Sequence, residues 1–141
     1  MSISKSFGVD KKQSQEGKWF EVDYDDNNKA VRFKLSYMSS QNKKMNKIST
    51  AVMKPYKRQI ENGSLPEPIS EKIAIEIFVR SVLLDWDNVI VNEGDGPLEF
   101  NEENATQLMK EFPTLFQYLL LMAKDFANFK QEENEELAKN S

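Results

Sequence analysis

The alternation of apolar and polar residues predicts a β-hairpin over residues 18–37. Apolar and polar positions alternate between residues 18 and 24, and again between residues 31 and 37. A period of two is that of a strand, whose successive side chains point to opposite faces. The intervening run Asp25–Asn28 consists of residue types that favour tight turns. Since a lone hairpin is only marginally stable in water, we expect its apolar face to pack on helices or on another copy of the chain.

Apolar residues at spacings of three and four predict four helices in the rest of the chain. The predicted helices cover residues 41–61, 70–86, 101–112 and 114–130. Pro55 predicts a break or kink in the first of them, because proline has no backbone N–H. Ser70 and Asn101 are expected to be N-caps. The predicted fold class is α+β, mainly α, with the N-terminal β-hairpin packed on a bundle of about four helices.

The domain organisation follows from where the apolar residues stop. With 141 residues the chain is long enough for a single core, which we place in one globular domain over residues 17–130. Residues 1–16 are mostly polar and predict a mobile N-terminal arm. Residues 131–141 are mostly charged or polar and predict a charged C-terminal tail.

Two of the predicted helices, 70–86 and 114–130, have only a narrow polar stripe. Such helices are central to a fold, and together with the one-sided hairpin they carry more apolar surface than a core of this size obviously uses. Large aromatic side chains dominate protein interfaces. We therefore predict an interaction protein whose candidate partner-binding residues are Trp86, Phe100, Phe112, Phe116, Phe126 and Phe129. For each of them the alternative is a place in the core.

Composition argues against most enzyme chemistries. The chain contains neither cysteine nor histidine, which removes thiol nucleophiles, the commonest general base and the commonest zinc ligand. Adjacent carboxylates such as Glu102 and Glu103 point apart on a helix, so they do not form an acid–base pair. We predict no catalytic, cofactor-binding or metal-binding residue and no cofactor. The longest apolar run, residues 118–123, is too short to cross a membrane, and no secretory signal is expected.

Charge is distributed unevenly along the sequence. Residues 1–60 contain 13 basic and 6 acidic residues, whereas residues 61–141 contain 6 basic and 17 acidic ones. This asymmetry could draw the basic part of one copy to the acidic part of the next, or could serve only solubility. Residues 43–58 contain six cations and no acid, which supports an alternative function as a small nucleic-acid-binding regulator. The chain as a whole is acidic, so nucleic acid is the less favoured partner.

Several motifs of the second half resemble those of a known family. The long apolar helix predicted here ends in Leu-Asp-Trp-Asp-Asn-Val at residues 84–89, and a Gly-Asp-Gly turn follows at 94–96. Pro-Leu-Glu-Phe-Asn-Glu-Glu-Asn at 97–104 and Phe-Pro-Thr-Leu at 112–115 come next. In this arrangement the chain resembles the tail assembly chaperones of long-tailed, siphovirus-like bacteriophages. The similarity extends over most of the chain and is densest at residues 69–129.

The resemblance implies a non-enzymatic function in the cytoplasm of the host cell. Tail assembly chaperones bind the tape measure protein, keep it soluble and help recruit tail tube subunits, and they are absent from the finished virion. They are mainly α-helical and tend to form multimers, which implies a homo-oligomer. The expected partners are therefore the tape measure protein and the tail tube protein. Several copies with apolar grooves could coat an apolar helical partner through many weak contacts.

Overall fold

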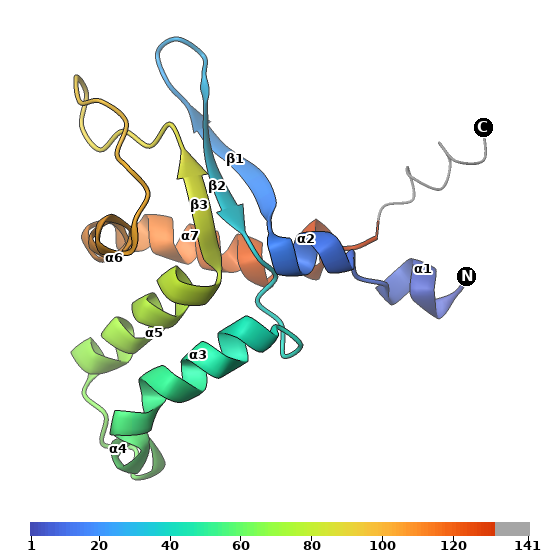
Figure 1. Cartoon of the computed structure of the whole chain (residues 1–141), viewed down its shortest axis with the longest axis vertical. Helices are drawn as coiled ribbons and strands as arrows, with labels where there is room; N and C mark the ends of the chain where they lie inside the picture. The colour runs from blue at the N-terminus through green and yellow to red at the C-terminus, as the bar shows by residue number, and fades with distance from the viewer. Residues whose placement is uncertain (132–141) are drawn as a thin grey trace.

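A three-stranded antiparallel sheet in the order β1–β2–β3 organises the fold (Figure 1). The computed structural model describes residues 1–131. Strands β1 (Lys18–Tyr24) and β2 (Ala30–Leu35) form the predicted hairpin, and β3 (Leu83–Asp87) pairs with the other edge of β2. Phe33 lies opposite Phe20 on one side and Trp86 on the other, so all three strands contribute an aromatic residue to the core.

Helices cover the buried face of this sheet. In Figure 1, α7 crosses behind the strands, while α3 and α5 run side by side towards the far end of the molecule. The helices and 3-10 turns along the chain are α1 (Ile3–Phe7), α2 (Lys11–Glu16), α3 (Lys43–Met53), η1 (Lys54–Tyr56), α4 (Lys57–Glu61), α5 (Glu67–Ser81), α6 (Glu102–Glu111), α7 (Pro113–Lys124) and η2 (Phe126–Asn128). The predicted class, α+β with an N-terminal hairpin packed on helices, is confirmed.

Local chemistry explains most helix boundaries. The predicted break at Pro55 is confirmed, because the α-helix gives way there to the 3-10 turn η1 before α4 begins. Asn101 caps α6 as predicted, its side chain accepting the backbone N–H of Asn104 at 2.7 Å. The last helix ends at Lys124 rather than near residue 130. Asp125 takes an extended backbone there, and its carboxylate caps η2 instead.

The prediction of one helix over residues 70–86 is wrong at both ends. The helix α5 begins at Glu67, because Pro68 in the first turn has no N–H that would need a partner, so Ser70 is not the N-cap. It ends at Ser81, and residues 83–87 form β3. A short apolar run fits the period of a helix or of a buried strand. Pairing with β2 decides between them, because it satisfies the backbone and buries Leu83 and Trp86 together.

The expected mobile arm is folded. Residues 3–16 form α1 and α2, and Val9 makes a β-bridge with Lys130. The N–H of Asp10 donates to the carbonyl of Phe129 at 2.8 Å, so the start of the chain is held against the end of the core. Of the predicted tail 131–141, all but Gln131 lies outside the described residues.

Candidate functional site: an apolar groove with an acidic rim

A groove of about 760 Å³ opens between three segments that are far apart in the sequence. They are the tip of the β1–β2 hairpin, the loop that follows β3 and the junction of α6 and α7. A volume of this size accommodates several side chains. Its apolar lining comes from all three segments and comprises Val22, Val31, Phe33, Val89, Ile90, Val91, Leu108, Phe112, Pro113 and Leu115.

The charged residues that line the groove all have the same sign. They are Asp23, Asp25, Asp26, Glu93, Asp95 and Glu111, and no described residue that lines it is a lysine or an arginine. We call the whole groove, with its apolar walls and these six acids, the acidic groove. Apolar walls with only negative charges favour an occupant that is both apolar and positively charged, and they disfavour an acidic one.

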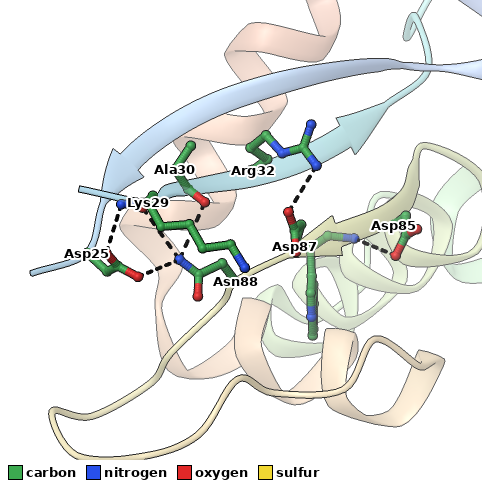
Figure 2. A network of polar contacts seen from close by, with 8 residues as sticks. Asp25, Lys29, Ala30, Arg32, Asp85, Asp87 and Asn88 are labelled. Carbon is green, nitrogen blue, oxygen red and sulfur yellow. Dashed lines mark hydrogen bonds and ion pairs between the residues drawn. The ribbon is translucent and has the colours of Figure 1, made fainter. Parts of the chain in front are cut away.

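One wall of the groove is fixed by a contact between Asn88 and the hairpin turn (Figure 2). The buried Asn88 has a φ of 60°, a conformation that asparagine tolerates better than most residues. Its side-chain amide donates to the Asp25 carboxylate at 2.9 Å and lies 3.4 Å from the carbonyl of Ala30. The hairpin tip and the end of β3 are thereby joined, although 63 residues separate them in the sequence.

Asp25 is the acceptor at the centre of this contact. Its carboxylate also accepts the backbone N–H groups of Asn27 and Lys29, each at 2.9 Å. The hydrogen bond from Asn88, followed by the one from Lys29, lowers the pKa of Asp25 below its ordinary value of 3.8. These donors favour the charged carboxylate, so the turn holds together best when Asp25 is ionised.

Asp25 should therefore make the stability of the protein depend on acid pH. A carboxyl group whose pKa is lower in the folded state stabilises that state above its unfolded pKa, and this stabilisation is lost as the pH falls through the folded value. We expect Asp25→Asn to lower the free energy of unfolding at pH 7, and the difference from the wild type to shrink below pH 3.8. Urea denaturation of both proteins at pH 7 and pH 3 measures this. A difference that does not depend on pH would contradict the assigned role.

The loop after β3 is anchored at both ends. The guanidinium of Arg32 on β2 contacts the Asp87 carboxylate at 2.9 Å (Figure 2). The indole N–H of Trp86 donates to the carbonyl of Leu98 at 2.8 Å, and the N–H of Leu98 donates to Val89 at 2.7 Å. These bonds close the loop on itself, so residues 89–95 form a defined side of the groove.

The predicted partner-binding aromatics have separate places in the structure. Phe112 lines the acidic groove at the junction of α6 and α7 and is 40% exposed. Phe100 and Phe126 are partly buried, and Phe100 packs edge-on against Trp86 at 4.9 Å between ring centroids. Partner contact by these three remains a prediction.

The other three predicted partner-binding aromatics lie in the core of the chain, and partner contact by them also stays a prediction. Trp86, Phe116 and Phe129 are all buried. Each packs against another aromatic ring: Trp86 on Phe33, Phe116 on Phe78, and Phe129 on Tyr37. Aromatic pairs of this kind stabilise the interior beyond the area they bury. The sequence pattern does not distinguish such pairs from interface anchors.

Sequence reasoning missed most of the groove and the apolar surface beside it. The apolar run Val89–Val91 inside an acidic loop was the available signal. On α7, Thr114 lines the groove, and Tyr118 and Leu121 follow four and seven residues later, so they share a face with it. Tyr118 is 48% and Leu121 69% exposed. Apolar surface therefore continues from the groove along α7.

A second charged surface lies on α3, η1 and α4. Six cations are exposed there: Lys43, Lys44, Lys47, Lys54, Lys57 and Arg58. In Figure 1, α4 lies at one end of the long axis, and the hairpin tip and the loop after β3 lie at the other. The cations of α4 and the carboxylates of the acidic groove therefore lie at opposite ends of the molecule.

Neither a metal-binding cluster nor a membrane-spanning helix is found in the part of the chain that the structure describes. Among residues 1–131 there is no group of three or more acidic side chains arranged to hold a metal ion. None of the helices in this part of the chain is long and apolar enough to cross a bilayer.

Comparison with models of known protein families gives a match. A family model described as YdaY prophage protein matches residues 40–140, more than two thirds of the chain. The matched region includes the loop after β3 and helices α6 and α7, but it leaves out the β1–β2 hairpin. No curated protein and no solved structure matches the chain.

Proposed function

Since the chain belongs to the YdaY prophage protein family, we propose that this phage-derived protein is a non-enzymatic tail assembly chaperone. In this proposal it binds the tape measure protein in the host cytoplasm, keeps it soluble and helps recruit tail tube subunits. The family supports only the phage origin. The finer assignment is supported by the motifs of residues 84–115 and by the acidic groove.

The observation that carries the proposal is the apolar lining of the acidic groove. A helix with one apolar face buries that face in such a groove through residues spaced three and four apart. Apolar area removed from water contributes roughly 25 cal/mol per Å², so a few side chains seated among Val91, Phe112 and Leu115 give binding of moderate strength. The exposed Tyr118 and Leu121 extend the contact along α7.

The carboxylates of the acidic groove suit a client whose apolar face is bordered by lysine or arginine. Complementary charges raise the rate of encounter and fix the orientation of the bound helix more than they raise its affinity. Moderate affinity at each copy is useful to a chaperone. Many copies can coat a long client by avidity, and each can leave when the tube protein competes for the same client.

Co-expression tests this proposal. We expect the tape measure protein of the same phage to be largely insoluble alone, and to become soluble and co-purify when this chain is present. The apolar faces of the tape measure protein are then buried in the grooves of this chain instead of against other tape measure molecules. The soluble fraction on a gel and the mass of the complex are the measurements. Equal solubility of the tape measure protein with and without the chain would rule the chaperone function out.

A second candidate function is nucleic-acid binding through the exposed cations of α3, η1 and α4. All six face solvent, as contacts with phosphate groups require. Retention of DNA or RNA at low salt, falling steeply as salt is added, is the property that would distinguish this function from the first.

A further inference from the structure

We propose that the acidic groove of one copy receives the η1–α4 segment of a second copy, residues 54–61, in a head-to-tail contact. The inference uses the same groove as the proposed function but does not depend on a tape measure protein. It can therefore be tested on the chain alone.

Charge complementarity is the first argument. The groove presents six carboxylates and no cation among its described lining residues. The segment 54–61 exposes Lys54, Lys57 and Arg58, with Glu61 as its one acid. The ion pairs formed among the described residues involve neither the acids of the groove nor the cations of this segment. Apart from Asp25, whose carboxylate is held by Asn88 and by the hairpin turn, the acids of the groove and the cations of the segment therefore have no described ion-pair partner in their own chain.

The segment also matches the apolar part of the groove. Ile60 is 41% exposed on α4, and Tyr56, four residues earlier, is only partly buried. Residues four apart lie on the same side of a helical turn. The segment therefore presents two apolar side chains bordered by cations. This is the combination that the valines, Phe112 and acids of the groove favour.

The shape of the molecule requires the contact to form between copies. Because α4 and the hairpin tip lie at opposite ends of the long axis, a chain cannot place its own α4 in its own groove (Figure 1). The contact joins two different surfaces, so each added copy leaves one groove and one segment open. Contacts of this kind build rings or open chains rather than closed two-fold dimers.

Sedimentation velocity of the full chain with paired charge substitutions tests the contact. Lys57→Glu with Arg58→Glu changes the segment and keeps the groove. Asp26→Asn with Asp95→Asn removes two carboxylates of the acidic groove and leaves the segment unchanged. The matched control is Lys11→Glu with Lys12→Glu, which reverses two exposed lysines on α2.

We expect the wild type and the control to associate at low salt, and to do so less as salt rises, because exposed charges are screened. Each of the other two variants should associate at least tenfold more weakly by itself. An equimolar mixture of these two should form a dimer and go no further. The variant with the altered segment supplies only an intact groove, and the variant with the altered groove supplies only an intact segment.

The proposal is overturned if the wild type stays monomeric at low salt, if the mixture forms no dimer, or if the control loses association as the segment variant does. None of these outcomes decides whether the chain acts as a chaperone. The segment variant keeps its groove and should still make the tape measure protein soluble, whether or not copies of the chain associate.

Discussion

Phe129→Ala is expected to lower the free energy of unfolding by about 3–5 kcal/mol, the usual cost of removing a buried aromatic ring. Phe129 is 0% exposed. Its ring stacks on Tyr37 at 4.9 Å and meets the edge of Phe20 at 5.8 Å. The cavity would open where the N-terminal arm joins the core, because the N–H of Asp10 donates to the carbonyl of residue 129. Urea or thermal denaturation measures the loss.

Phe7→Ala is the matched control for this prediction. Phe7 lies on α1 and is 65% exposed, so removing its ring should change the free energy of unfolding by no more than about 0.5 kcal/mol. Equal effects of the two substitutions would show that Phe129 is not part of the core. The comparison also tests directly whether this residue belongs to the interior or to an interface.

The elements that the sequence predicted well are those with long, regular patterns. The hairpin alternates over many residues, and α3, α6 and α7 repeat their apolar positions over several turns. β3 was missed because its five residues follow an apolar helix without a glycine or proline between them. Only the partner strand β2 decides their conformation, and strand pairing over some 50 residues of sequence leaves no local signal.

Only single residues of the acidic groove could be predicted from the sequence, because the groove, like β3, depends on contacts between distant segments. Phe112 was identified from its type, but the other walls depend on tertiary contacts such as the bond between Asn88 and Asp25. In the sequence, Asp25 and Asp26 indicate only a turn, and no local pattern groups them with the other acids of the groove. Asp23, Asp25 and Asp26 belong to the basic half of the sequence, and folding brings them beside Glu93, Asp95 and Glu111 from the acidic half. A charge count along the chain cannot reveal this grouping.

Phe112 is positioned by its backbone, while its side chain lies at the edge of the groove. It is both the C-cap of α6 and the N-cap of α7, and its backbone N–H donates to the carbonyl of Leu108. The backbone therefore fixes the ring at the edge of the groove, while the ring itself remains 40% exposed. A substitution that keeps the backbone bonds should change the groove more than it changes stability.

Phe112→Ser is accordingly expected to weaken binding of a tape measure segment about ten- to thirtyfold. This corresponds to the loss of roughly 1.4–2 kcal/mol that a central aromatic contact commonly contributes. Fluorescence anisotropy with a labelled amphipathic peptide from the tape measure protein measures the affinity. Phe7→Ser removes an equally large ring at a distance from the groove and should leave the affinity unchanged. If both variants bind as the wild type does, the client does not occupy the acidic groove. If both lose affinity equally, the effect is not specific to it.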